Sequence, residues 1–139
     1  MRHFSAENYS ARSGARPALI MPQDRPTASE LLAAIADFLR EEATPVLDRA
    51  DPRLGFQMRV AANSLAILER EARLGPAADA REHQRLVALL GRDGTLEELN
   101  RALAQQLRTG QRDERDPALM AHLEATIADK IAIANPKWR

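Results

Sequence analysis

The chain has no cysteine, few aromatic residues and no excess of either charge. Without cysteine it can form no disulfide, no thiolate zinc site and no cysteine nucleophile, and it fits a reducing compartment, so we expect a cytoplasmic protein. Its 20 basic residues equal its 20 acidic ones, so no overall positive field attracts nucleic acid or anionic lipid. We therefore expect neither nucleic acid nor a membrane as a partner.

β-Branched residues are also scarce. The sequence holds 3 Val, 6 Ile and 5 Thr against 26 Ala and 18 Leu, which is the reverse of what strands prefer and typical of helices. A chain of 139 residues can bury one substantial core. The composition therefore predicts a single all-α domain.

The first 21 residues differ from the rest, because their apolar residues do not recur at helical spacing. We expect residues 1–21 to form a disordered tail, or the first twenty residues to precede a true start at Met21. The apolar run Ala18–Met21 is too short for a signal peptide or a membrane span. The predicted helical domain is 22–139. It has 17 basic and 19 acidic residues, which gives a charge of −2.

Capping signals and prolines divide this domain into helices. Thr27 and Glu30 form a capping box that starts a helix over 28–43. Pro45 lacks a backbone donor and disfavours helix at the residue before it, so we expect a connector over 44–52.

The next segment is apolar on two flanks, which predicts a central core helix over 53–74 that ends at Gly75–Pro76. Later capping and stop signals predict three more helices. These are 77–90, the segment from Thr95 to Gly110, and Pro117–Ala134. The predicted architecture is a bundle of five helices, or of four long helices with 77–90 as a cross-piece.

No catalytic signature is found. The sequence lacks a phosphate-binding glycine loop, a nucleophile elbow and a zinc-binding His-Glu helix. Neither His83 nor His122 has a carboxylate three residues earlier, as a di-iron bundle requires. We expect no metal and no cofactor, and the sequence favours a protein that is not an enzyme without deciding the question.

Several polar residues border the predicted apolar faces, and they form the candidate site for an anionic ligand between the helices 53–74, 95–110 and 117–134. They are Arg59, Asn63, Asn100, His122 and Lys130. Four of them also have a structural interpretation. Arg59 and Asn63, with Arg70, could line a solvated face, Asn100 could bridge to another helix, and Lys130 could extend its charge into water past the core edge.

Small residues follow one side of the last helix, namely Ala121, Ala125, Ala128 and Ala132. Alanines at this spacing permit a close helix approach, either by a neighbour in the bundle or by a second subunit of a homodimer.

Together, the stretches RVAANSLAILERE (59–71), LLGRDGTLEELN (89–100) and Asp116 to Pro136, with the opening 22–32, resemble a family of small bacterial helical proteins classed as a domain of unknown function. The resemblance covers about residues 22–136. Such proteins are often encoded beside aminoglycoside-phosphotransferase-like kinases and acyl-CoA dehydrogenases. The resemblance implies an accessory role beside such enzymes and brings no catalytic residues.

The sequence thus favours a non-catalytic interaction protein that works with a phosphotransferase-like kinase or an acyl-CoA dehydrogenase. The alternative is a small-molecule binding protein or minor enzyme, and it requires the five polar residues of the candidate site to converge.

Overall fold

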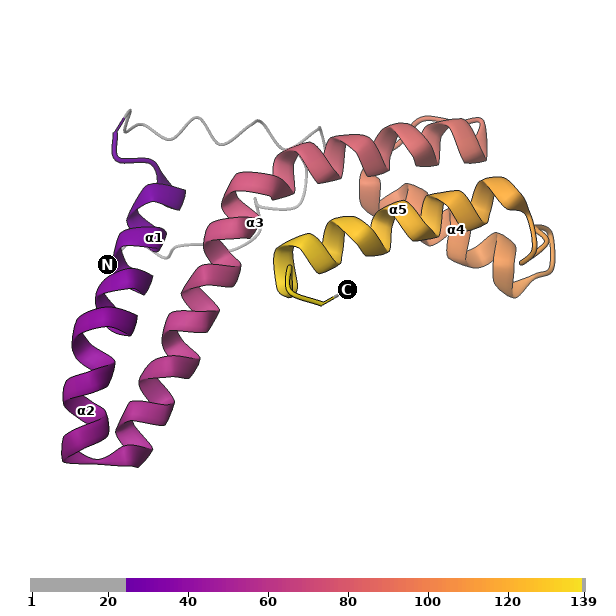
Figure 1. Cartoon of the computed structure of the whole chain (residues 1–139). Helices are drawn as coiled ribbons and strands as arrows, with labels where there is room; N and C mark the ends of the chain where they lie inside the picture. The colour runs from indigo at the N-terminus through magenta and orange to yellow at the C-terminus, as the bar shows by residue number, and fades with distance from the viewer. Residues whose placement is uncertain (1–24, 139) are drawn as a thin grey trace, which may run out of the picture.

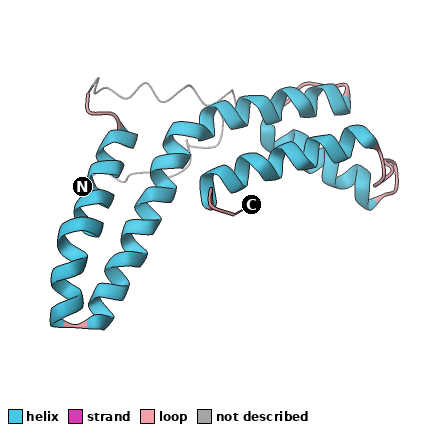
Figure 2. Cartoon of the chain, viewed as in Figure 1, coloured by secondary structure: helices cyan, strands magenta, loops and turns pink. Residues whose placement is uncertain are grey.

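The computed structural model describes residues 25–138 and confirms the all-α fold, since these residues form helices and no strand (Figures 1 and 2). The predicted tail over 1–21 lies outside the described residues. Counting the unbroken run from 28 to 50 once, the described chain has four helical rods, within the predicted range of four to five.

The first rod contains α1 (Ala28–Phe38), the π-helix η2 (Leu39–Ala43) and α2 (Thr44–Ala50). Its capping box is formed as predicted. The Glu30 amide donates to Thr27 Oγ1 at 3.3 Å, and the Thr27 amide donates to Glu30 Oε2 at 2.7 Å. These two bonds satisfy backbone donors that the helix itself leaves without partners.

The predicted connector over 44–52 is wrong, because the chain continues as helix past Pro45. The wider π turn accommodates the proline ring. Both the amide and the hydroxyl of Thr44 donate to the Leu39 carbonyl, the hydroxyl at 2.7 Å. Pro45 therefore changes the helix only by one π turn. The chain reverses direction later, at Asp51, the single residue between α2 and the next helix.

The second rod, α3 (Pro52–Leu90), corrects the predicted break at Gly75–Pro76, which lies inside it. The helix ends at Gly91, whose φ of 65° is the left-handed geometry that favours glycine. Packing partners explain the continuity, because α1 and α2 pack along the first part of α3 while α4 and α5 pack along its later part (Figure 1). The helix bends between these parts (Figure 1), as expected near a proline.

The remaining helices, α4 (Leu96–Arg108) and α5 (Pro117–Ala134), agree with the prediction. Thr95 and Glu98 form the second capping box, and Asp116 Oδ1 accepts from the Ala118 amide at 2.9 Å. Local chemistry alone therefore sets the start of both helices.

The buried leucine core lies where 75–90 of α3 meets α4 and α5, a region we call the C-terminal unit. Its fully or nearly fully buried members are Leu86, Leu99, Leu103 and Leu119. Five further apolar side chains from α3 and α4 pack against them, among them Leu89 and Leu107. The largest fully buried side chains of the described residues lie in this unit, and the burial of such apolar side chains drives folding.

The other packing unit, which we call the N-terminal hairpin, is formed by α1, η2, α2 and 52–74 of α3. Its buried residues are all small, namely Ala36, Thr44, Gly55 and Ala62. A Cβ on Gly55 would lie 2.9 Å from the Asp48 Cα, so glycine is needed where α2 and α3 approach each other. Five large apolar side chains of 53–74 are exposed, so this segment is not the buried core that the sequence predicted. Its helix α3 is nevertheless central, since it contacts every other helix of the described chain.

Candidate functional site

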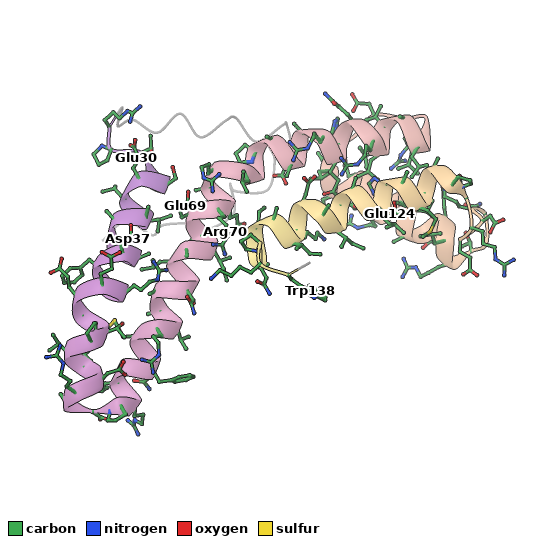
Figure 3. The ribbon with its side chains drawn as sticks, viewed as in Figure 1. Glu30, Asp37, Glu69, Arg70, Glu124 and Trp138 are labelled. Carbon is green, nitrogen blue, oxygen red and sulfur yellow. The ribbon has the colours of Figure 1, made fainter. Side chains whose placement is uncertain are left out.

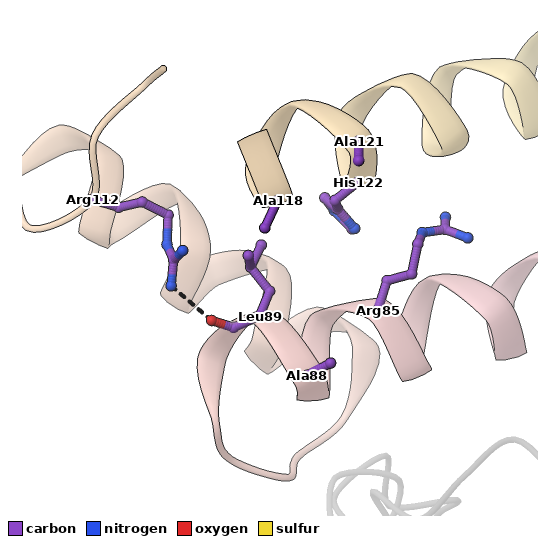
Figure 4. A pocket seen from close by; sticks show the side chains of 7 residues that line it. All are labelled: Arg85, Ala88, Leu89, Arg112, Ala118, Ala121 and His122. Carbon is purple, nitrogen blue, oxygen red and sulfur yellow. Dashed lines mark hydrogen bonds between the residues drawn. The ribbon is translucent and has the colours of Figure 1, made fainter. Parts of the chain in front are cut away.

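An open groove of about 490 Å³ runs between the end of α3 and the first half of α5 (Figure 4). Its lining combines two arginines, one histidine, one leucine and three alanines. They are Arg85, Ala88, Leu89, Arg112, Ala118, Ala121 and His122. Cationic groups and methyl walls thus share one concave surface, the combination that small-molecule sites commonly use.

Arg112 comes from the loop before α5 and holds three elements together. Its Nη2 donates to the Leu89 carbonyl at 2.7 Å, its Nη1 to Asp116 Oδ2 at 2.7 Å and its Nε to Gln106 Oε1 at 3.1 Å. These bonds join the end of α3, the end of α4 and the start of α5. Arg112 is therefore a structural member of the groove wall, with its charge balanced by Asp116.

Arg85 projects from α3 toward α5 (Figure 4). Its Nη2 donates to Thr126 Oγ1 at 3.2 Å and lies 3.8 Å from Asp129 Oδ2. Asp129 is also paired with Arg81 at 2.6 Å, so two guanidinium groups share one carboxylate. The Nε of Arg85 is buried and has no hydrogen-bond partner in the described chain.

His122 lies in the groove across from Arg85 and is 4% exposed. Its Nδ1 is buried and likewise has no hydrogen-bond partner among the described residues. Burial lowers the pKa of the His122 imidazole, the positive charge of Arg85 lowers it further, and Glu82 acts in the opposite direction. The ring is therefore held neutral at neutral pH.

The five polar residues predicted as a ligand site are not gathered into one pocket. Arg59 and Asn63 lie on the N-terminal hairpin, where Arg59 pairs with Asp48. Asn100 on α4 donates to Glu82 Oε1 at 2.9 Å, which is the bridging role expected of a helical asparagine. Only His122 lines the groove.

Lys130 is exposed on α5, as the snorkelling interpretation expects. Arg70, which the sequence placed on a solvated face with Arg59 and Asn63, instead caps α5, since its Nε donates to the Ile133 carbonyl at 2.6 Å (Figure 3). The alanine stripe has mixed surroundings. Ala121 lines the groove, Ala125 is half-buried, and Ala128 and Ala132 are exposed.

Two residues of the groove escaped sequence reasoning. Arg112 falls in the charged run 111–115, which is typical of a solvated loop, and its contact with Leu89 spans 23 residues of sequence. Arg85 stands between a polar and an apolar stretch with no pattern that marks it. Neither has a sequence signal, because both positions depend on how α5 returns along α3.

A second feature of the molecule is a set of large apolar side chains on one side of the N-terminal hairpin. They are Leu31, Ile35 and Phe38 on α1, and Leu54 and Leu68 on α3, each at least 40% exposed. We call them the apolar face.

Helix geometry places these five side chains on the same side of the hairpin. Successive helical residues turn by about 100°, so both sets are displaced in the same rotational sense from the buried line through Ala36 and Ala62. In an antiparallel pair, stripes displaced in the same sense lie on the same side. The other side carries Asp37, Arg59 and Asn63, all exposed. It also carries the exposed Phe56 and Val60 of α3, so polar and apolar side chains are mixed there.

The described chain contains no cluster of three or more His, Cys, Asp or Glu residues that could hold a metal ion. Among the same residues, no helix has the length and hydropathy required to span a bilayer.

A family model described as "Domain of unknown function (DUF6285)" matches residues 48–138, which include the end of α2 and all of α3, α4 and α5. The matched region begins later than the resemblance over 22–136 suggested, and it leaves α1 outside. Neither the curated proteins nor the solved structures give a match. Since the family model matches more than half of the chain, this protein belongs to the DUF6285 family.

Proposed function

We propose that this chain is an interaction protein that binds another protein through the apolar face of its N-terminal hairpin. The observation that supports this proposal is the distribution of small and large apolar residues within that hairpin. Small residues lie between the two helices, while Ile35 and Phe38 are 48% and 53% exposed. Large apolar side chains left in water are costly, and contiguous exposed patches mark interaction sites.

The shape of the face suggests its occupant. It is two helices wide and extends from Leu31 to Phe38 on α1, which is about two helical turns. A pair of apolar helices laid across it would complete a four-helix arrangement, the common way to bury such a layer.

The partners to test first follow from the resemblance, and they are an aminoglycoside-phosphotransferase-like kinase and an acyl-CoA dehydrogenase, the enzymes beside which such proteins are often encoded. The proposal places the complex in the bacterial cytoplasm, which the cysteine-free composition supports. Binding to either partner does not require catalytic activity in this chain.

The test is isothermal titration of the full chain into each purified partner, with Ile35→Glu as the disrupting variant. A charge at the centre of the face must be desolvated on docking, so we expect binding to weaken at least about tenfold. Circular dichroism and thermal melting should show an unchanged fold, since Ile35 is already half-exposed.

Val60→Glu is the matched control. Val60 is 49% exposed, nearly the same as Ile35, and lies on the far side of α3. We expect it to leave the affinity within about twofold. Equal losses for both variants would contradict the assignment of the face. Absence of binding to both partners would contradict the proposed partners, and a homodimer that Ile35→Glu dissociates would make a second copy the occupant of the face.

A further inference from the structure

The groove between α3 and α5 contains hydrogen-bonding capacity that the protein itself leaves unused. His122 is 4% exposed, yet its Nδ1 has no partner in the described chain, and the Nε of Arg85 across the groove has none there either. Buried polar atoms are nearly always paired, and an unpaired one is costly. Two such atoms on facing helices leave two hydrogen-bonding positions that a ligand can fill.

The charge of the lining favours an anion. Two arginines and no acidic residue of the described chain line the groove. Arg112 is neutralised by Asp116, but Arg85 shares Asp129 with Arg81 and so keeps part of its charge. Glu82 also acts on His122, and its carboxylate is held by Asn100 of α4. A neutral imidazole can donate from either ring nitrogen, so Arg85 and His122 are both available as donors.

The alanines that line the groove restrict the chemistry of the part of the ligand that is not the anionic group. Ala88, Ala118 and Ala121 present methyl groups, which suit a short aliphatic chain and offer no polar partner to a sugar or a base.

We propose that this groove binds a small aliphatic carboxylate, with Arg85 and His122 donating hydrogen bonds to its two oxygens and the alanine methyls packing on its chain. This site goes beyond the proposed docking face, because it lies in the other packing unit and uses different residues. The same carboxylate chemistry could come from a free acid or from the carboxyl end of a peptide.

The test uses labelled full-length chain and sodium butyrate as the probe, followed by nuclear magnetic resonance at constant ionic strength. We expect saturable shifts of the Arg85 Nε–H and of the Ala118 and Ala121 methyls. Butyramide, which has the same shape without charge, should produce none. N-acetyl-trialanine with a free or an amidated end distinguishes a peptide source, and binding of only the free-ended peptide would support the same chemistry from that source.

Arg85→Gln should weaken butyrate binding at least tenfold. Arg81→Gln is the matched control, because Arg81 also pairs with Asp129 but does not line the groove, and it should change affinity less than twofold. If Arg85→Gln fails to fold, the wild type still decides the question, since a bound anion should raise the pKa of His122. The proposal is overturned if shifts do not saturate, if butyramide matches butyrate, if both variants weaken binding equally, or if the pKa of His122 is unchanged.

Discussion

His122 is a titratable residue that is almost fully buried. Because burial and Arg85 hold its pKa below the ordinary value, the folded chain keeps this ring neutral at pH values where the unfolded chain protonates it. The unfolded state then binds more protons, so the free energy of unfolding should fall as the pH drops below about 6.5. Glu82, the nearby carboxylate, reduces this effect without reversing it.

Urea unfolding between pH 8 and pH 5.5 measures this prediction, together with a titration of the His122 ring protons. Glu30, Glu98 and Asp116 also have lowered pKa values, each mainly through a backbone hydrogen bond. Their contributions are lost only at more acidic pH, so they do not interfere. A His122 ring that titrates at or above pH 6.5 would contradict the burial argument.

Arg112 is the residue on which the groove wall depends. Arg112→Ala removes hydrogen bonds to Leu89, Asp116 and Gln106, and we expect a loss of about 2 kcal/mol in the free energy of unfolding, since the side chain is mostly buried and the bonds are charge-assisted. Chemical denaturation measures the change.

Arg115→Ala is the control for Arg112→Ala, since it makes the same substitution in the same loop at an exposed position. It should change the free energy of unfolding by less than about 0.5 kcal/mol. Similar losses for the two variants would mean that Arg112 does not join the three elements.

At the scale of single helices, local signals predict where helices start, and they fail where packing overrides a proline. Thr27, Thr95 and Asp116 cap as expected because a cap involves only neighbours in sequence. The sequence also predicts that helices end near Pro45 and Pro76, and neither end is found. The reason is packing between residues far apart in sequence, because the helical segments before and after each proline pack against other helices.

Two glycines test whether α3 is continuous, and they should respond with opposite signs. Gly75 lies within the helix, and a Cβ added there would meet only Glu71 Cγ, at 3.8 Å, so Gly75→Ala should stabilise the protein by about 0.5–1 kcal/mol. Gly91 has φ of 65°, so Gly91→Ala should destabilise it by about 1 kcal/mol. Thermal melting of both variants decides. A loss from Gly75→Ala would support a helix that ends at 75.

The candidate site was less predictable than the helices. His122 could be selected from sequence because a histidine on an apolar face is conspicuous. Its partner Arg85 could not, because the arginine becomes part of a groove only when α5 folds back along α3. The apolar face was partly visible, since Leu31, Ile35 and Phe38 recur at helical spacing, but this spacing alone predicts an internal core.

For the whole molecule, the shared helix α3 joins two units of different character. The C-terminal unit buries leucines from three helices, while the N-terminal hairpin buries alanine, threonine and glycine and leaves larger side chains outside. A two-helix layer has too little buried area to be stable alone. The hairpin is therefore the part of the molecule that gains most from a partner.

Hydroxyl-radical footprinting of the full chain, alone and with a bound partner, tests this account most directly, because it reports side-chain exposure residue by residue. We expect the partner to protect Leu31, Phe38 and Leu54 while Phe56, exposed on the far side of α3, keeps its oxidation rate. Protection of Phe56 alone, protection confined to α5, or no protection at all would contradict the assignment of the apolar face as the docking surface.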